Sequence, residues 1–401
     1  MAKVITDIEL INKFLNRGVD SIFPGKDELK RKLMSGERIR AYQGFDPTGP
    51  YLHVGHAMGI RALRILQQLG HEVVFLVGDY TAKVGDPDKP TGRPILSDKT
   101  IKDNMQGWKK QAAQLIDFDG ENPVLFRRNY EWLSKLKLAD LIRLMSHATV
   151  QQMMERDLFQ RRLSENNPIG LQEFIYPLMQ GYDSVAMDVD LEIGGTDQTF
   201  NMLVGRNLCK SYLNKEKFVR TNQMMEAPDG VTMSKTKGNG INLSDTPENM
   251  YGKAMSYSDN QIVKGLFLLT EMEDEEIKEI DQLLRKGENP MKYKKIMAFE
   301  IVKTIKGRKA AEKAQGNFEK VVQNKEIAEE NITYVSPAEK TTILNFLKSS
   351  VGSESSSQIK RVIEQGGVEV NGEQVKNPFQ EFEFNTGLVI KFGKRTFFKV
   401  K

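Results

Sequence analysis

The chain has 401 residues, of which 39% are hydrophobic and 28% are charged, so it is long enough for two or three domains with separate cores. Its formal net charge of +4 is too small to indicate a polyanionic partner by itself. A single cysteine excludes an internal disulfide, and with four histidines it leaves few ligands for a structural zinc site. We therefore expect a cytoplasmic protein, because the sequence also lacks the apolar core of a signal peptide and the roughly 20 apolar residues of a membrane span.

The first recognisable unit runs from a strand through a helix to a second strand. An opening helix precedes the expected strand at Arg38–Gly44, Ala57–Leu69 has apolar residues at helical spacing, and Glu72–Val77 is an apolar run that ends at a glycine. Strand, helix and strand in this order predict a βαβ unit in a parallel sheet. A ligand is expected at the carboxyl ends of its strands.

The segment GFDPTGPYLHVGH, residues 44–56, connects the first strand to its helix. Its glycines, prolines and acidic residue are typical of an ordinary turn. A phosphate site is the alternative, because small residues allow close backbone approach and a helix N-terminus favours anions. His53 and His56 add donors to the same segment. A lone pair with this spacing is more often structural, but its position after the first parallel strand favours the phosphate site.

Residues 101–182 are expected to be mostly helices inserted between two halves of the sheet. At the end of this insertion, Tyr176, Gln180 and Asp183 have spacings that place them on one helical face. Such a face is usually solvated. The surrounding apolar residues instead indicate a buried helix, and buried polar groups need partners.

A strand is expected again at Asp190–Ile193, followed by the turn GGTDQ at residues 194–198. Residues 229–239, DGVTMSKTKGN, form a glycine-flanked loop with two lysines, which is often no more than an exposed loop. Thr246 and Pro247 then give a good helix start, and a helical, lysine-rich region extends to about residue 323.

The composition changes once more after Pro337, to a small mixed module. A capped helix is expected at 355–363, then a turn at Gly366–Gly367, a strand and a hairpin. Residues 389–401 contain basic residues without any acid, interleaved with Phe392, Phe397 and Phe398. A stabilising appendage is the plain interpretation, whereas the basic and aromatic pattern favours contact with RNA phosphates and bases.

Taken together, these motifs resemble the class I aminoacyl-tRNA synthetases. Residues 53–56 are similar to the HIGH signature, residues 232–236 (TMSKT) to the KMSKS loop, and the GFDPT lead-in and YxxxQxxD helix to the bacterial-type tyrosyl branch. The final module resembles an S4-type RNA-binding domain. The resemblance implies an α/β fold with a Rossmann-like parallel-sheet catalytic domain and a helical insertion, then an α-helical domain and a small α+β domain. It implies activation of tyrosine with ATP and transfer to tRNA(Tyr).

The resemblance also implies the site residues. The implied catalytic set is His53, His56, Thr48 and Lys235. Tyrosine would be bound by Tyr42, Asp86, Tyr176, Gln180, Asp183 and Gln198, with Tyr42 and Asp183 at the phenolic hydroxyl. ATP would contact Gly44, Asp46, Gly55, Arg93, Gly195, Asp197, Met225 and Lys235. Since Thr232 stands where the family has its first loop lysine, its charge is lost or passes to Lys237, Arg93 or Lys89.

The implied domains are residues 1–244 (catalytic, with an insertion at about 101–185), 245–335 (helical, anticodon-binding) and 338–401 (S4-like). RNA contacts are expected from Lys360, Arg361, Lys394 and Arg395. Mg²⁺ would be held chiefly by phosphates, and the sequence provides no metal-ligand set of its own. We expect a homodimer that forms through helices around Val150–Arg162. We expect no membrane partner.

Two alternatives remain at this stage. A tryptophanyl-type synthetase shares the fold, but Tyr42 and Asp183 suit a phenol better than an indole, and that enzyme normally lacks an S4-like tail. A non-catalytic RNA-binding protein derived from a synthetase would explain the loss of the first loop lysine. The retained histidines and Lys235 favour an enzyme.

Overall fold

The structure, a computed structural model, describes residues 2–86, 96–231, 233, 239–320, 332–336, 338–351, 355–393 and 396–401. The chain divides into two compact units, residues 1–312 and residues 313–401. The expected α/β architecture with a small C-terminal module is confirmed.

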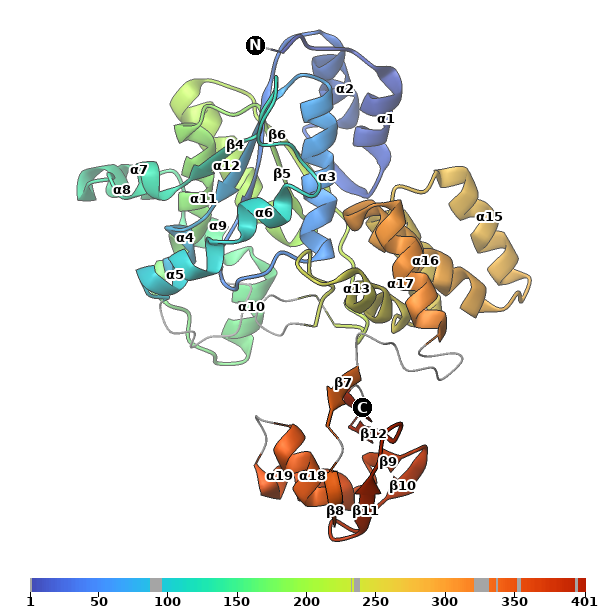
Figure 1. The fold of residues 1–401 in the computed structure, drawn as a ribbon. Helices are drawn as coiled ribbons and strands as arrows, with labels where there is room; N and C mark the ends of the chain where they lie inside the picture. Colours follow the sequence, from blue (N-terminus) through green and yellow to red (C-terminus); the bar gives the residue numbers. More distant parts are fainter. Residues whose placement is uncertain are drawn as a thin grey trace. The chain divides into compact units, whose positions relative to one another are not determined.

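A six-stranded sheet forms the centre of the first unit (Figure 1). Its strands, in spatial order, are β1 (Val19–Phe23), β6 (Phe218–Asn222), β5 (Leu191–Gly195), β2 (Arg40–Phe45), β3 (Glu72–Val77) and β4 (Leu125–Arg128). All neighbouring strands are parallel except β1, which runs antiparallel to β6. The three expected strands are present as β2, β3 and β5, while β1, β4 and β6 were not predicted.

Helices cover both faces of this sheet, so its central strands β5, β2 and β3 are mostly buried. Helix α3 (Val54–Gln68) packs on β2, β3 and β5, and α12 (Thr199–Leu213) packs on β5 and β6 with α11 (Tyr176–Ala186) beside it. Successive side chains of a strand point to opposite faces. The Gln43 side chain accordingly lies against Gly59 of α3, while the hydroxyl of Tyr42 bonds to α11. The α11 face of the sheet therefore carries the predicted tyrosine contacts.

The predicted helical insertion is present, with one strand inside it. It contains α5 (Asp98–Met105), α6 (Trp108–Ala112), β4, α7 (Tyr130–Leu133), α8 (Leu138–Met145), α9 (Val150–Met154), α10 (Asp157–Ser164), the 3₁₀ helix η1 (Leu171–Phe174) and α11. Figure 1 shows α7 and α8 extending away from the sheet. The remaining helices of the N-terminal part are α1 (Ile8–Asn16), α2 (Lys26–Met34) and the short α4 (Thr81–Val84).

The helical region after residue 245 begins where it was predicted. Thr246 caps α13 (Pro247–Met255) by accepting the Asn249 N–H, and η3 (Asp259–Gln261), α14 (Ile262–Leu269), α15 (Asp274–Arg285), α16 (Pro290–Lys306) and α17 (Arg308–Phe318) follow. Two arginines from the N-terminal part of the chain, Arg17 after α1 and Arg61 in α3, bind the C-terminal end of α14. Arg17 donates to the Phe267 carbonyl at 2.7 Å, and Arg61 to that of Thr270 at 2.6 Å. These bonds satisfy carbonyls that a helix end leaves open.

The second unit has its own core. Strands β9 (Val368–Val370), β10 (Glu373–Val375), β12 (Val389–Phe392), β13 (Thr396–Val400) and β7 (Ile332–Val335) form one sheet, and β8 (Ala338–Thr342) pairs with β11 (Glu381–Phe384). Helices α18 (Ile343–Ser350) and α19 (Ser356–Glu364) pack with them. Ser355 caps α19 as predicted. Phe392 and Phe398 are buried in this core, so the prediction that they stack on RNA bases is wrong.

Candidate active site

The candidate site lies where the parallel strands β2, β3 and β5 end. Asp46 follows β2, Thr81 follows β3 in α4, and Asp197 follows β5 in the 3₁₀ helix η2 (Thr196–Gln198). Carboxyl ends of parallel strands lie at one edge of a sheet. The fold therefore brings the motifs of three separate segments to the same place.

His53 and His56 occupy the first turn of α3, as predicted. His53 is the N-cap residue, its backbone N–H donates to Nδ1 of His56 at 3.0 Å, and the two ring centroids are 3.7 Å apart. Because Nδ1 accepts, the proton of a neutral His56 lies on Nε2, which is then a donor. A donor at a helix N-terminus suits an anion such as phosphate.

The described residues that flank 234–238 lie beside this histidine segment. Met233 is buried, and a Cβ added to Gly240 would lie 3.3 Å from both its sulfur and the His53 Cβ. The Val54 N–H donates to the Ile241 carbonyl at 2.9 Å. Residues on either side of 234–238 thus lie near the segment that carries the histidines, and Ile241 is hydrogen-bonded to it. Thr232, Lys235 and Lys237 themselves lie outside the residues that the structure describes.

Asp183 is a buried carboxylate held by donors from the insertion. It accepts Trp132 Nε1–H at 2.7 Å and Asn129 Nδ2–H at 3.1 Å. Burial raises the pKa of Asp183 well above its usual value, although these two bonds oppose the rise. Tyr42 is fully buried nearby, and its own pKa is raised by burial and by the charges of Glu192 and Asp183. The two residues predicted for a phenolic hydroxyl are therefore neighbours.

A buried ion pair lies directly behind Tyr42. Glu192 on β5 is the strand partner of Tyr42, and Lys217 bonds its Oε2 atom. Their side chains are 2% and 0% exposed. Ser184 on α11 lies 2.8 Å from the Tyr42 hydroxyl and 2.9 Å from Lys217 Nζ. Gln180 Nε2 donates to Glu192 Oε1 at 3.1 Å. Gln180 of the predicted helix face thus shares one hydrogen-bond network with Tyr42, Ser184, Glu192 and Lys217.

The Tyr176 side chain reaches the loop that follows β2. Its hydroxyl donates to Asp46 Oδ2 at 2.9 Å, and Thr81 Oγ1 donates to Oδ1 of the same carboxylate at 2.7 Å. Burial raises the pKa of Tyr176 well above its usual value, and the nearby Asp46 charge adds to the rise. A side chain at Gly78 would collide with Asp46 and Thr81, which requires glycine there. Asp46, which was predicted to contact ATP, therefore also orients the Tyr176 side chain.

Asp86 and Gln198 meet on the other side of the site. Gln198 Nε2 donates to Asp86 Oδ2 at 2.8 Å, and Arg156 pairs with Oδ1 at 2.9 Å. Arg156 is buried and comes from the junction of α9 and α10. The insertion thus supplies a cation to a carboxylate that was predicted to bind an amino group.

Small and apolar residues line the predicted nucleotide side. Gly44 is exposed at the end of β2. Met225 is buried, and its methyl lies 3.7 Å from a Cβ added to Gly265 on α14. Met224 is instead the partly exposed methionine beside Gly195. Both methionines were predicted to border the adenine, and of the two side chains Met224 is the more exposed.

Thr48 Oγ1 is buried, and no partner for it is found among the residues that the structure describes. An orphaned buried hydroxyl next to the histidine segment fits a site whose remaining partner is a ligand. Two further basic residues predicted for phosphate, Lys89 and Arg93, lie outside the described residues.

Six site residues were not predicted: Asn129, Trp132, Arg156, Ser184, Glu192 and Lys217. One signal was available for Glu192, which is the charged residue in the apolar strand LEIGG. A buried charge needs a partner. Nothing in the sequence indicated that the partner is Lys217.

In the second unit, Lys360 and Arg361 are exposed on α19 as an RNA contact requires, and Lys360 Nζ also lies 5.5 Å from the centre of the Phe379 ring. Lys394 and Arg395 lie outside the described residues.

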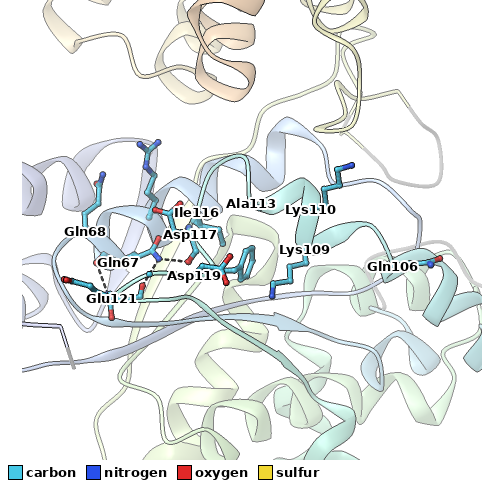
Figure 2. A pocket seen from close by; sticks show the side chains of 14 residues that line it. Gln67, Gln68, Gln106, Lys109, Lys110, Ala113, Ile116, Asp117, Asp119 and Glu121 are labelled. Carbon is cyan, nitrogen blue, oxygen red and sulfur yellow. Dashed lines mark hydrogen bonds between the residues drawn. The ribbon is translucent and has the colours of Figure 1, made fainter.

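A separate surface pocket of about 930 Å³ lies between the C-terminal half of α3, α6 and residues 116–122 (Figure 2). Gln67 spans its wall by donating to the carbonyls of Asp117 and Asn122. None of the predicted substrate residues lines it.

No helix in the described part of the chain is long and apolar enough to cross a membrane. Among the same residues, no cluster of three or more His, Cys, Asp or Glu side chains forms a metal site.

Most of the chain matches known protein families. Residues 34–323 match the family described as tRNA synthetases class I (W and Y), and residues 342–384 match the S4 domain family. A tyrosine–tRNA ligase of Thermotoga maritima is 39% identical over 391 residues, 97% of this chain and 96% of the relative. One of Legionella pneumophila is 40% identical over 390 residues, 96% of each.

Solved structures of tyrosyl-tRNA synthetases share the fold. A C-terminally truncated mitochondrial enzyme of Aspergillus nidulans has a TM-score of 0.65 at 22% identity and covers 78% of this chain and 94% of its own. The enzyme of Archaeoglobus fulgidus, complexed with L-tyrosine, has a TM-score of 0.60 at 23% identity and covers 77% of this chain and 100% of its own.

Proposed function

This chain belongs to the class I tRNA synthetases of the W and Y family, and from this we propose that it acts as a tyrosine–tRNA ligase. It activates L-tyrosine with ATP to tyrosyl-adenylate and pyrophosphate, and it then transfers tyrosine to the 3′ end of tRNA(Tyr). The near full-length relatives that carry this activity support the assignment.

The observation that carries the choice of tyrosine is the buried pair of Tyr42 and Asp183. Asp183 accepts the phenolic proton of the substrate, and Tyr42 bonds to the phenolic oxygen. A buried polar group without a partner costs about 1–3 kcal/mol. Phenylalanine would leave unmade the bond that each of these two groups forms with the substrate hydroxyl. An indole has no hydroxyl to place between them, which argues against the tryptophanyl alternative.

At the other end of the substrate, the amino group is bound by Asp86, Tyr176 and Gln180. Gln198 lies beside the carboxylate, and its bond to Asp86 supports that placement because it joins the two groups that must hold one α-carbon. Asp197, which is exposed in η2, contacts the ribose. Gly44, Gly55 and Gly195 leave room for close approach of the nucleotide, and Met224 with Met225 borders the adenine.

Adenylation needs positioning and charge stabilisation rather than a covalent enzyme intermediate. The tyrosine carboxylate attacks the α-phosphorus of ATP, the bond to the β-phosphate oxygen breaks, and pyrophosphate leaves. His53, His56 and Thr48 donate to phosphate oxygens from the N-terminus of α3. Lys235 offsets charge on the leaving pyrophosphate, with Arg93 as a further cation. The bond of Ile241 to the histidine segment and the nearby position of Met233 support this pairing.

Mg²⁺ enters with ATP and is held chiefly by its phosphates. Mg²⁺ suits this placement because it usually keeps several waters and is bound through substrate phosphates rather than by an all-protein cage.

The C-terminal regions hold the RNA. We assign residues 245–335 to the anticodon region and residues 338–401 to the S4-like module, with Lys360, Arg361, Lys394 and Arg395 as RNA contacts. The match to the S4 family over residues 342–384 supports the second assignment. The single cysteine of the chain suits a reducing, cytoplasmic setting.

We assign the predicted homodimer to the insertion. Leu138 and Ile142 on α8 are 73% and 60% exposed, and Val150 at the start of α9 is 67% exposed. Leu138 and Ile142, four positions apart, share one face of α8, and exposed apolar faces of this kind are typical of a protein interface. They extend the predicted interface, residues 150–162, toward α8.

The proposal is tested by charging purified tRNA(Tyr) with labelled tyrosine and ATP. We expect the chain to release one AMP for each tyrosine attached. Charging of tRNA with tryptophan instead of tyrosine, or binding of tRNA without charging, would contradict it.

A further inference from the structure

The buried pair of Glu192 and Lys217 lies behind both ends of the substrate site. Both side chains are almost completely inaccessible, and they come from two adjacent parallel strands, β5 and the residue before β6. A pair buried this deeply is a weak source of stability, because two desolvation penalties oppose the attraction. Its contacts with Ser184 and Gln180 indicate another role.

Lys217 sets the direction of the hydrogen bonds toward Tyr42. Its ammonium group has only donors, so Ser184 Oγ, at 2.9 Å, must accept from it. The one proton of Ser184 has two acceptors within reach, the Tyr42 oxygen at 2.8 Å and Glu192 Oε2 at 3.4 Å, and the shorter contact favours Tyr42. Tyr42 accepts that proton and directs its own phenolic proton away from Ser184.

Glu192 sets the orientation of Gln180 in the same way. Glu192 pairs with Lys217 as a carboxylate, and a carboxylate only accepts. The atom of Gln180 that faces it, at 3.1 Å from Oε1, must therefore be the amide nitrogen. The amide oxygen is turned the other way, where it can accept from an ammonium group.

We propose that the Glu192–Lys217 pair is a positioning element that fixes both tyrosine contacts: it makes Tyr42 a donor to the substrate hydroxyl and Gln180 an acceptor for the substrate ammonium. Since Asp183 accepts the substrate phenolic proton, the chain of donors runs from Lys217 through Ser184, Tyr42 and the substrate to Asp183. Only a ring substituent that both accepts and donates completes this chain. The inference rests on the proposed tyrosine–tRNA ligase function and adds residues that do not touch the substrate.

The test is tyrosine- and phenylalanine-dependent ATP–pyrophosphate exchange in the full-length chain. One variant is Lys217→Met with Glu192→Gln, which removes both charges and leaves no unpaired ion. The other is Ser184→Ala, which breaks the link to Tyr42 and keeps the ion pair. In both, we expect the ratio of kcat/KM for tyrosine over phenylalanine to fall about 10- to 100-fold, as expected for a misdirected buried hydrogen bond. The loss appears in the KM for tyrosine, while kcat/KM for phenylalanine changes little.

Lys215→Met is the matched control. Lys215 pairs with Asp188 at 2.9 Å and with Asp190 at 3.0 Å near the surface, so its loss removes a lysine ion pair next to the same strand without touching the network. Its selectivity ratio should equal that of the wild type.

An unchanged selectivity ratio in Ser184→Ala, or in a folded double variant, would overturn the inference while leaving the proposed function intact. Equal losses for both amino acids would also overturn it, because they indicate a merely structural role. If the double variant does not fold, Ser184→Ala decides alone. A wild-type chain without tyrosine-dependent exchange would remove the proposed function and this inference with it.

Discussion

The indole Nε1–H of Trp132 donates to Asp183 Oδ1 at 2.7 Å, across 51 positions of the chain. Trp132 lies in α7 of the insertion, and Asp183 lies on α11, so the contact ties the two segments together at the phenol end of the site. A bond to an ionised acceptor is stronger than one between neutral groups. Trp132 thus helps a buried carboxyl group to remain ionised.

Trp132→Phe should therefore weaken tyrosine activation at neutral pH. Loss of a hydrogen bond to a charged group costs about 1.5–3 kcal/mol, which we expect as a lower kcat/KM for tyrosine. The pKa of Asp183, already raised by burial, rises further without this donor. The acid limb of kcat/KM plotted against pH should move to higher pH. Trp108→Phe, which replaces a buried tryptophan in α6, is the control, and a matching shift in that variant would contradict the assignment.

Tyr42→Phe tests the other contact of the substrate hydroxyl. We expect the preference for tyrosine over phenylalanine to fall by roughly 1–3 kcal/mol, because the substrate hydroxyl then lacks one partner. The measurement is pyrophosphate exchange with each amino acid. Tyr293→Phe, in the core of the helical region, should leave the preference unchanged. Equal discrimination in Tyr42→Phe and wild type would remove Tyr42 from the specificity site.

The sequence predicted the strands whose apolar runs are continuous, such as Glu72–Val77, and it did not predict β6. That strand contains Arg220, Thr221 and Asn222, which are typical of an exposed segment. Their partners come from distant parts of the chain: Arg220 donates to the carbonyls of Phe14 and Arg17, both at 2.9 Å. Tertiary partners of this kind leave no periodic pattern in the sequence.

Site residues within one motif were predictable, whereas the residues that support them were not. Tyr176, Gln180 and Asp183 share a helix face because their spacing dictates it. Lys217 reaches Glu192 only because β5 and β6 are adjacent in the sheet, and β6 was not predicted. The positions of the lysine loop and of Arg93 stay predictions.

We predict that His71 makes the folded protein less stable in acid. It is buried, and its Nδ1 accepts the Ile39 N–H at 3.4 Å. Burial, followed by the charge of Arg38, lowers the pKa of His71 from 6.5 to about 4. A depressed pKa gives stability that is present above the unfolded value and is lost as the pH falls toward the folded value. Between pH 6.5 and about 4, the free energy of unfolding should fall by up to about 1.4 kcal/mol per pH unit from this group.

Denaturant unfolding of His71→Gln measures this contribution, since the variant cannot protonate there. Its stability should depend less steeply on pH than that of the wild type over this interval. His147→Gln, at an exposed position, is the control. Identical slopes for His71→Gln and wild type would show that His71 is not held neutral by burial.

Removal of residues 338–401 separates activation from RNA binding. Tyrosine-dependent pyrophosphate exchange should stay nearly intact, because that reaction needs no tRNA, while charging should fail. The residual tRNA binding should have a shallower salt dependence, by about 0.7–0.9 in the slope of log K against log salt for each lost phosphate contact. A cooperative melt must first show that the truncated chain is folded. Normal charging by such a chain would contradict the RNA-binding role of the module.

The central claim, that the chain activates tyrosine, is tested most directly by ATP–pyrophosphate exchange with tyrosine, tryptophan and phenylalanine in separate reactions. We predict rapid exchange with tyrosine and little with the other two, because the buried groups at Asp183 and Tyr42 require a phenolic hydroxyl. Exchange that is faster with tryptophan, or absent with all three, would contradict the account.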